Sequence, residues 1–465
     1  MTTISLGRGR WIDQWNPEDE SFWQATGKKI ATRNLIYSIF AEHLGFSIWL
    51  LWSVVAVSLP LAGFDFTVDQ LFWLVAVPNL VGSFMRIPYT TAVAKFGGRN
   101  WTTISAALLM IPLGLMVLCV TNPATPYWMF LVAAATAGFG GGNFASSMAN
   151  ISFFYPERAK GTALGLNAAG GNIGVAVVQM LVPLVIGLGV VGAAQAPGLF
   201  LQNAPLLWLV PVLAATVCAW LFMDNLTAAK AKVSEQLSAL RNKHTWVMSF
   251  LYIGTFGSFI GYSAAFPLLI KSQFPDVPAV YLAFLGPLVG SVSRPFGGWL
   301  SDKIGGAKIT MWNFVLMGVG VFGVVTALGV HHFGFFLASF LALFVTTGIG
   351  NGSTYRMIPA IFRAEALRAS DLAETSAAGE AKEKALVLGR REAAAVIGLA
   401  SAIGAFGGFL IPRGFGMSIA ATGSIVPALY VFLAAYGVMV GVTWWYYLRR
   451  SLLTSQAPSL AYASV

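Results

Sequence analysis

Charged residues inside apolar stretches are the residues of this sequence whose types could do chemistry. Arg86 lies in FMRIPYTTAVAKFGG, and the chain carries no other charge between Asp69 and Lys95. If this stretch is helical, a rise of 1.5 Å per residue places Arg86 roughly 13 Å from the Lys95 end, near the middle of a bilayer. A charged side chain there costs about 2.5–3.5 kcal/mol. We therefore expect Arg86 either to bind an anion or to form a structural ion pair.

A second arginine has the same neighbours. Arg86 is followed by a lysine nine residues later and by glycines eleven and twelve residues later. Arg294, which lies 208 residues further on, is followed by the same residue types at the same distances. The spacing indicates an internal repeat that places both guanidiniums at equivalent depths. Because two facing guanidiniums repel unless an anion lies between them, the pair favours a small oxyanion that accepts parallel N–H donors.

Another pair of segments supports the repeat and shows where it is interrupted. Residues 163–174, ALGLNAAGGNIG, and residues 396–408, VIGLASAIGAFGG, have glycines at the same internal spacing but 233 residues apart. The additional 25 residues fall in 364–390, a charged, Ala-rich stretch without an apolar span. We interpret it as a cytoplasmic insertion, either helical or flexible. The repeated glycines, which let membrane helices approach closely, are expected where moving helices meet: Gly171, Gly174, Gly404 and Gly407.

The composition predicts an all-α integral membrane protein. The chain has 465 residues, of which 57% are hydrophobic and only 10% charged, and its mean hydropathy is +0.73. Soluble proteins contain about a quarter charged residues. Apolar runs of about 20 residues predict twelve spans. They begin near residues 34, 71, 101, 127, 161, 205, 246, 278, 308, 333, 393 and 426.

The distribution of charge predicts the topology. Of the 28 Lys and Arg residues, three arginines are predicted within spans. Only Lys271 and Arg413 are predicted in loops on one side of the membrane, so all the other Lys and Arg residues lie on the opposite side. By the positive-inside rule that side is cytoplasmic, with both termini inside, and the net charge of +10 indicates no nucleic-acid partner. The predicted parts are a tail (1–33), a six-helix bundle (34–225), a linker (226–245), a second six-helix bundle containing the insertion (246–450), and a tail (451–465).

An acidic residue also lies within the first span. In FAEHLGFSIWLLW, Glu42, Phe46 and Trp49 share one helix face, and His43 follows Glu42. An intramembrane carboxylate is by default a functional-site hypothesis, and proton binding is its commonest use in transporters. The alternative is a structural ion pair, for example with Arg356 in span ten. The sequence leaves both interpretations open, with His43 as a candidate proton relay.

The other polar and aromatic residues of the spans are candidates for the cavity walls. Asn167 and Asn172 are polar residues within a glycine-rich span, and four aromatic residues would supply flat, weakly polar walls: Phe46, Phe144, Tyr252 and Phe256. Packing is the alternative for each of them. The two cysteines lie far apart, and no metal, cofactor or enzyme constellation is recognisable. We therefore expect no metal, no cofactor and no enzymatic activity.

A loop motif and several longer segments resemble a known family. Residues 298–308 match GxLxDKxGGxK, which resembles the loop motif of the major facilitator superfamily, whose Asp and basic residues lock helix ends. At the equivalent first-half position Ala94 replaces Asp302. GNFASSMANISFF, GTALGLNAAGGNIG, YIGTFGSFIGYSAAF, GSTYRMIPAIF and SAIGAFGGFLIP together resemble the NarK-type nitrate/nitrite porters of that superfamily, over nearly the whole chain.

The resemblance implies a fold, a substrate and roles for the residues. It implies twelve helices in two six-helix bundles, with Arg86 and Arg294 clamping nitrate or nitrite. It further implies polar contacts from Tyr252, Asn172 and Ser401, aromatic walls from Phe46, Phe144 and Phe256, and gating by Asp302, Lys303 and Arg356. Glu42, His43 and Arg356 differ from the exchanger pattern of the family.

These differences favour proton-coupled nitrate import. Moving one negative charge inward against 100 mV costs about 2.3 kcal/mol, so uptake needs coupling. The sequence predicts a monomeric, multi-pass protein of the cytoplasmic (inner) membrane whose partners are the anion, protons and membrane lipids. An electroneutral nitrate/nitrite antiporter, a porter for another small anion, and a channel or nutrient sensor remain alternatives.

Overall fold

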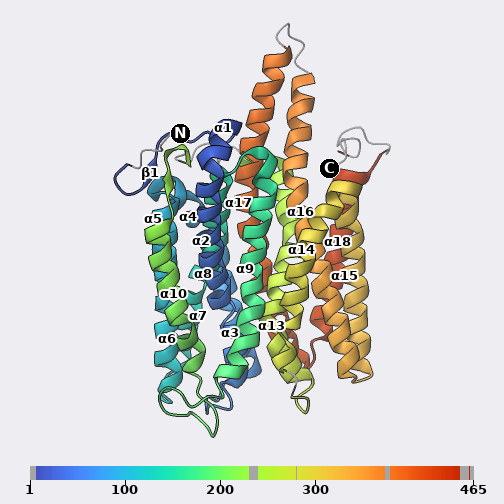
Figure 1. The fold of residues 1–465 in the computed structure, drawn as a ribbon. Coiled ribbons are helices and arrows are strands. Elements are labelled where there is room, and N and C mark those ends of the chain that lie inside the picture. The colour runs from blue at the N-terminus through green and yellow to red at the C-terminus, as the bar shows by residue number, and fades with distance from the viewer. Residues whose placement is uncertain (1–6, 230–238, 279, 372–377, 451–459, 461–464) are drawn as a thin grey trace. The chain divides into compact units, whose positions relative to one another are not determined.

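The computed structural model describes residues 7–229, 239–278, 280–371, 378–450, 460 and 465 (Figure 1). Parts of both predicted tails, the middle of the linker and the centre of the insertion therefore lie outside the described residues. Nearly all described residues are helical, which confirms the predicted all-α class.

The chain forms two compact units. Unit 1 comprises Met1–Ala231, Ile260–Leu288 and Gly408–Gly423, and unit 2 comprises Lys232–Phe259, Val289–Gly407 and Ser424–Val465. Unit 1 thus contains parts of three helices from the second half of the sequence: all but the first two residues of Ser258–Gln273, the start of Leu285–Ile304 and the end of Ala378–Thr422. The predicted domain boundaries stay predictions.

Residues 7–229 of unit 1 form the following elements: β1 (Trp11–Ile12), α1 (Glu20–Phe22), the π-helical turn η1 (Trp23–Gly27), α2 (Lys28–Trp49), α3 (Trp52–Ser58), α4 (Val68–Phe96), α5 (Gly98–Leu108), α6 (Met110–Thr121), α7 (Tyr127–Ala137), α8 (Phe139–Phe154), α9 (Glu157–Val185), α10 (Asn203–Phe222), β2 (Asn225–Leu226) and the short turn η2 (Thr227–Ala229).

The remaining elements are the short turn η3 (Ala239–Arg241), α12 (Lys243–Tyr252), the π-helical turn η4 (Ile253–Gly257), α13 (Ser258–Gln273), the short turn η5 (Val280–Leu282), α14 (Leu285–Ile304), α15 (Gly306–Gly329), α16 (Phe333–Asp371), α17 (Ala378–Thr422), α18 (Val426–Thr443) and the π-helical turn η6 (Trp444–Leu448).

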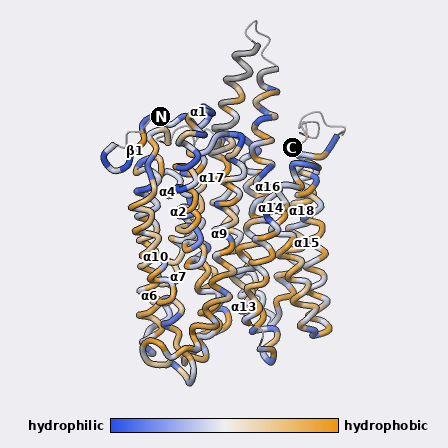
Figure 2. Tube along the Cα trace, viewed as in Figure 1, coloured by the Kyte–Doolittle hydropathy of each residue, from blue (hydrophilic) through white to orange (hydrophobic). Residues whose placement is uncertain are grey.

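Among the described residues, ten helical segments are long and apolar enough to cross a membrane. The other two predicted spans coincide with the pair α7 and α8, which is interrupted at Gly138, and with α14, so the structure agrees with twelve. The first helical segment begins at Glu20, not near residue 34, because the Asp19 side chain accepts hydrogen bonds from the backbone N–H groups of Ser21 and Phe22 and caps it. Apolar residues dominate the middle of these helices (Figure 2).

The structure decides between the two interpretations of the insertion. Helix α16 continues to Asp371 and α17 begins at Ala378, so the described residues of 364–390 are helical. The two helices pack there, since a Cβ added at Gly389 would lie 2.9 Å from the Phe362 carbonyl oxygen. In Figure 1 they run side by side toward the insertion.

Equivalent glycines end the helices that carry the two arginines. Gly97 follows α4 with a φ of 87°, and Gly305 follows α14 with a φ of 99°. A side chain is strained in this backbone conformation, so glycine is required at both positions. The sequence repeat is therefore also a repeat of backbone geometry.

The N-terminal segment is part of unit 1. β1 pairs in parallel with β2, and Trp11 lies opposite Asn225. Ile12 and Trp23 are buried in an apolar cluster that also contains Phe154 and Leu226. Residues of the predicted tail (1–33) thus fasten the start of the linker to the helices of unit 1.

Candidate functional site

Arg86 is completely buried in the second half of α4. Its Nε donates a hydrogen bond of 3.0 Å to the carbonyl oxygen of Gly141 in α8. Its guanidinium carbon lies 4.7 Å from the centre of the Phe144 ring and 5.4 Å from that of Trp49. These contacts with aromatic faces and a carbonyl dipole fix the plane of a cation within the membrane-spanning part of unit 1.

A glycine run brings the neighbouring helices close enough for these contacts. A Cβ added at Gly140 would lie 2.1 Å from the carbonyl oxygen of Gly45, and one added at Gly141 would lie 2.7 Å from the Trp49 ring. Larger residues at these positions of α8 would push α2 away. Phe46 of α2 consequently meets Phe144 edge-on at 6.1 Å, so two of the predicted wall residues lie together beside Arg86.

Glu42 forms a separate buried cluster in unit 1. It is 1% exposed, and its Oε2 accepts hydrogen bonds from the Ser147 hydroxyl and, at 2.5 Å, from Asn167 Nδ2. A Cβ added at Gly171 would lie 2.5 Å from Glu42 Oε1. The predicted Gly171 therefore provides the space that the carboxylate occupies between α2 and α9.

The two residues next to this cluster differ in their surroundings. Asn172 is 1% exposed, and neither atom of its amide has a hydrogen-bond partner among the described residues. His43 is half-buried, and its Nδ1 lies 3.1 Å from the carbonyl oxygen of Gly170. Successive helix residues point about 100° apart, so His43 leaves α2 in another direction than Glu42. A Cβ at Gly174 would lie 2.3 Å from the His43 carbonyl oxygen, so this glycine also sets the contact between α2 and α9.

Unit 2 contains the other predicted binding residues. Arg294 of α14 is 6% exposed, and its guanidinium carbon lies 5.7 Å from the Tyr355 ring centre. Tyr252 and Phe256 are buried and stack at 5.3 Å across the π-helical turn η4. Such turns occur frequently at functional sites.

The predicted residues of α17 lie beside this aromatic pair or close to it. A Cβ added at Gly404 would lie 2.5 Å from the Tyr252 ring, and one added at Gly407 would lie 2.7 Å from the Cα of Gly257. Ser401 is buried and donates a hydrogen bond of 2.8 Å to the carbonyl oxygen of Gly398. The repeated glycines therefore place helices in close contact in both units, as their spacing suggested.

The predicted gating residues form an ion pair in unit 2. Arg356 Nε lies 2.5 Å from Asp302 Oδ1, and both side chains are 51% exposed. Lys303 lies over the Trp299 ring at 4.1 Å. Asp302 is therefore an ionic partner of Arg356. The sequence had suggested an ion pair between Arg356 and Glu42 as one structural alternative.

A second ion pair lies in unit 1, in the first turn of α4. Arg413 Nη1 of α17 lies 2.8 Å from Asp69 Oδ1, and the arginine also covers the Trp73 ring at 4.1 Å. Seventeen residues separate Asp69 from Arg86, about 25 Å along the helix. Also in unit 1, the Gln179 side chain donates a hydrogen bond of 2.7 Å to the carbonyl oxygen of Ser263, which joins α9 to α13.

Sequence analysis missed two asparagines. Asn143 in unit 1 and Asn351 in unit 2 are 3% and 1% exposed, and neither side-chain amide has a hydrogen-bond partner among the described residues. A buried polar group without a partner costs about 1–3 kcal/mol. The signal was present, since each asparagine follows a glycine and the two Gly-Asn pairs are 208 residues apart.

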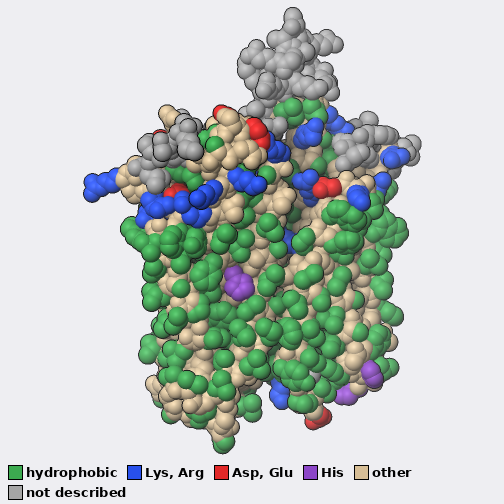
Figure 3. All heavy atoms as spheres, in the orientation of Figure 1, with side chains coloured by type: hydrophobic (Ala, Val, Ile, Leu, Met, Phe, Trp, Pro, Cys, Tyr) green, Lys and Arg blue, Asp and Glu red, His purple; other side chains and the backbone are tan. Residues whose placement is uncertain are grey.

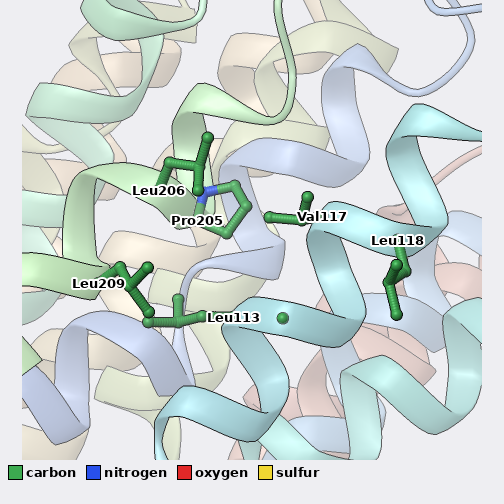
Figure 4. Close-up of a pocket in the computed structure, with 7 residues that line it drawn as sticks. Leu113, Val117, Leu118, Pro205, Leu206 and Leu209 are labelled. Atoms are coloured by element: carbon green, nitrogen blue, oxygen red, sulfur yellow. The ribbon is translucent and has the colours of Figure 1, made fainter. Parts of the chain in front are cut away.

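A cavity elsewhere in unit 1 has no such chemistry. It measures about 380 Å³, lies between α6 and α10, and is lined by Leu113, Val117, Leu118, Pro205, Leu206, Leu209 and the backbone of Gly114 (Figure 4). Its walls are apolar, which suits contact with hydrocarbon and not with an anion. Among the described residues, no group of three or more His, Cys, Asp or Glu side chains is placed to hold a metal.

The comparisons with known proteins assign the fold and the family. The model of the Major Facilitator Superfamily matches residues 44–412. The nitrate/nitrite transporter NarU of Escherichia coli (strain K12) is 46% identical over 94% of this chain and 96% of its own length. The probable nitrate/nitrite antiporter NarK2 of Thermus thermophilus is 36% identical over 96% of this chain and 98% of its own length.

Solved structures show the same fold. A D-xylose-proton symporter, which is 14% identical, superposes with a TM-score of 0.64 over 88% of this chain and 96% of its own. The xylose transporter XylE of E. coli, in a partially occluded inward-open conformation, is 12% identical and has a TM-score of 0.64 over 90% and 97% of the two chains. At these identities the likeness is one of fold alone.

Together these findings define a membrane transporter of the class that the resemblance had indicated. The chain belongs to the Major Facilitator Superfamily and, within it, to the NarK-type nitrate/nitrite porters. It is a multi-pass, all-α membrane protein.

Proposed function

We propose that this protein imports nitrate, with nitrite as a further candidate substrate, across the cytoplasmic membrane by alternating access, coupled to protons. The observation that carries the proposal is Arg86, a fully buried arginine within a membrane-spanning helix. Its plane is fixed by two aromatic rings and a carbonyl group. Chains that are 46% and 36% identical are named for nitrate and nitrite. Nitrate is a planar oxyanion and nitrite a bent one, and both can accept hydrogen bonds from the parallel N–H groups of a guanidinium.

In this mechanism Arg86 and Arg294 bind the anion from the two repeats. The aromatic residues beside Arg86 exclude water, so each guanidinium hydrogen bond to the anion is stronger than it would be in water. Asn143, Asn172 and Asn351 bring buried amides that need partners, and an oxyanion accepts hydrogen bonds from their N–H groups. Tyr252 and Ser401 supply hydroxyl groups in unit 2.

Proton coupling is assigned to Glu42. As a carboxylate, Glu42 accepts hydrogen bonds from Ser147 and Asn167. Protonation would remove its negative charge and part of its capacity to accept hydrogen bonds. Since a negative charge competes with the substrate for the arginine, protonation of Glu42 would favour anion binding. One nitrate entering with one proton moves no net charge, and entry with two protons is driven inward by the membrane potential. His43 is the proposed relay.

Alternating access requires contacts that open and close on each side. The ion pair of Asp69 with Arg413 and the contact of Arg413 with Trp73 join α4 to α17, helices from the two halves of the sequence, and fit such a closing contact. The pair of Asp302 and Arg356 is exposed, so it can break at low cost, as a gating contact must.

The orientation follows from the positive-inside rule. On the face shown in Figure 3, Lys and Arg side chains gather at the end that carries β1 and α1. We assign this end, with both termini, to the cytoplasmic side of the inner membrane. We further propose a monomer without enzymatic activity.

Nitrate/nitrite exchange is the second candidate function. The relative from T. thermophilus, which is 36% identical over nearly its whole length, is named a probable antiporter. Exchange of one monovalent anion for another moves no net charge and needs no proton, so Glu42 would then serve only the structure.

Uptake into proteoliposomes separates the two functions. The protein and a Glu42→Gln variant are reconstituted without internal nitrite, and nitrate uptake is followed under an imposed inward proton gradient. Symport predicts accumulation in the wild type and loss of the gradient's effect in the variant. If nitrate enters only when nitrite is loaded inside, the protein is an exchanger. Ser53→Ala, which removes a buried hydroxyl of α3 outside the Glu42 cluster, serves as the control.

A further inference from the structure

A hollow of about 500 Å³ lies along the outer face of the helix that opens unit 1. It is lined by residues of η1 and α2, among them Lys28, Lys29, Arg33, Ile36 and Tyr37. Lys28, Thr32 and Ile36 follow one another at intervals of four residues, and Lys29, Arg33 and Tyr37 do the same, so the two rows lie side by side on the helix surface. We propose that this hollow binds the headgroup of an anionic phospholipid.

The first argument is uncompensated charge. Lys28 and Lys29 are exposed, and within the part of the chain that the structure describes neither has an acidic partner. The nearby acidic residues are already engaged. Glu20 pairs with Arg158, and Asp224 pairs with Arg10 and Arg33. Two adjacent ammonium groups beside a concave surface form a site for a phosphodiester.

The second argument is the change of polarity along the helix. Lysines and an arginine occupy residues 28–33, whereas Ile36 is 56% exposed and Tyr37 stacks on Phe222 at a centroid distance of 5.1 Å. From Lys28 to Ile36 the helix rises about 12 Å, which spans the distance from a headgroup to the first part of the acyl chains. A lipid can therefore place its phosphate at the lysines and its chains on Ile36 and on exposed apolar residues of α10.

Phe222 of α10, on which Tyr37 stacks, continues the apolar surface. Leu221 is 49% exposed and Phe222 is 40% exposed at the end of α10. A free phosphate would use the lysines and leave this surface to other molecules. A diacyl phospholipid uses both, so the combination of charge and adjoining apolar surface favours a lipid over a soluble anion.

Lipid binding to the purified full-length protein tests the proposal. Retention of phosphatidylglycerol and of phosphatidylcholine is measured by native mass spectrometry for the wild type, for Lys28→Gln/Lys29→Gln and for the control Lys95→Gln/Lys308→Gln, which removes the same charge at other exposed positions. Each lysine near an anionic lipid contributes about fivefold in affinity, so the first variant is expected to bind phosphatidylglycerol roughly 25-fold more weakly. The control is expected to change it less than threefold.

Three results would overturn the proposal. Equal losses in both double variants would mean that only net charge matters. Equal retention of phosphatidylcholine would mean that the headgroup charge is not recognised. Inorganic phosphate that competes at the same concentration as phosphatidylglycerol would identify a soluble anion as the ligand. Lys28→Arg/Lys29→Arg should restore binding, and a thermal unfolding curve for each variant separates lost binding from lost folding. None of these readouts depends on transport.

Discussion

The two repeats of this protein use the same helix end in different ways. In unit 2, Asp302 at the end of α14 pairs with Arg356 of α16, and both side chains are half exposed. The positions 208 residues earlier are Ala94 and Met148, so unit 1 has neither partner. The backbone there is nevertheless the same, because Gly97 and Gly305 both end their helices with a positive φ.

Unit 1 has a different ionic centre, which lies close to Gly97 at the end of α4 because Asn225 contacts this glycine. Asp224, at the end of α10, is fully buried and binds the side chains of Arg10, Arg33 and Asn34. The backbone N–H of Asp224 donates to Asn34, and β1 and β2 pair directly beside it. The first repeat is thus fastened by residues outside the repeat, whereas the second is fastened by its own loop motif.

The difference teaches which contact can change during a transport cycle. An exposed ion pair gains little from its attraction, so the Asp302 contact can form and break at small cost. A buried carboxylate loses hydration and depends on every partner it has, so the Asp224 cluster must stay intact. We infer that, of these two ionic centres, gating uses the exposed pair of Asp302 and Arg356, while the Asp224 cluster stays intact.

Arginine replacements should have the largest effect and show whether the repeats are equivalent at the substrate. Arg86→Lys and Arg294→Lys keep the charge but lose parallel N–H donors, and losing two charge-assisted hydrogen bonds is worth on the order of 100-fold. We expect nitrate uptake by proteoliposomes to fall by about that factor in both variants. If Arg86→Lys took up nitrate at the wild-type rate and with the wild-type concentration dependence, Arg86 would not belong to the proposed clamp.

Removal of the buried carboxylate should have the largest effect on stability. Asp224→Ala leaves Arg10 and Arg33 beside a site without its anion, and breaking a buried pair costs about 3–5 kcal/mol. Thermal unfolding of the purified protein should shift downward accordingly. Asp13→Ala is the matched control, since Asp13 is exposed and accepts one hydrogen bond, from Thr227. Equal shifts in the two variants would contradict the role given to Asp224.

Alanine at the equivalent glycines should separate strain from packing. Both Gly97→Ala and Gly305→Ala meet an unfavourable backbone conformation, which costs on the order of 1–3 kcal/mol. An added Cβ at Gly97 would also lie 2.3 Å from the side-chain oxygen of Asn225, whereas at Gly305 the nearest atom is 3.7 Å away. We therefore expect the midpoint of thermal unfolding to fall further for Gly97→Ala. The reverse order would mean that Asn225 and β2 can move away from the added Cβ at little cost in free energy.

Loss of the exposed ion pair should have the smallest effect on stability. Asp302→Ala is expected to change the free energy of unfolding by about 0.2–1 kcal/mol, because both partners are half exposed. The double variant Asp302→Ala/Arg356→Ala should be no less stable than the single one, as a double-mutant cycle with thermal unfolding would measure. A loss comparable to that of Asp224→Ala would abolish the contrast between the two units.

Much of this architecture could be predicted from the sequence because it rests on local patterns. Runs of apolar residues predicted the spans, which the structure shows. The 208-residue spacing predicted a repeat, and the glycines with positive φ that end α4 and α14 agree with it. The alternatives for residues 364–390 could not be separated by composition, since Ala-rich charged stretches suit both exposed helices and flexible loops. The early start of the first helix was missed because its cap is a single polar residue in a polar segment.

Contacts between distant residues were beyond such patterns. Arg10 and Asp224 are 214 residues apart, and nothing near either residue indicates the other. The buried amides of Asn143 and Asn351 left a trace in the repeated Gly-Asn pairs, but a small polar residue in a glycine-rich helix is as compatible with packing as with binding.

The sequence by itself determined that the chain spans the membrane, that it is a repeat, and that each half carries an arginine in an apolar helix, because hydropathy and spacing are properties of short segments. The tertiary structure alone decided which groups those residues meet. It placed Gly141, Phe144 and Trp49 around Arg86, Ser147 and Asn167 on Glu42, and the N-terminal strand beside Asp224. The reason is physical: a buried polar group takes its partners from whichever helices pack against it, and helix packing depends on contacts over the whole chain.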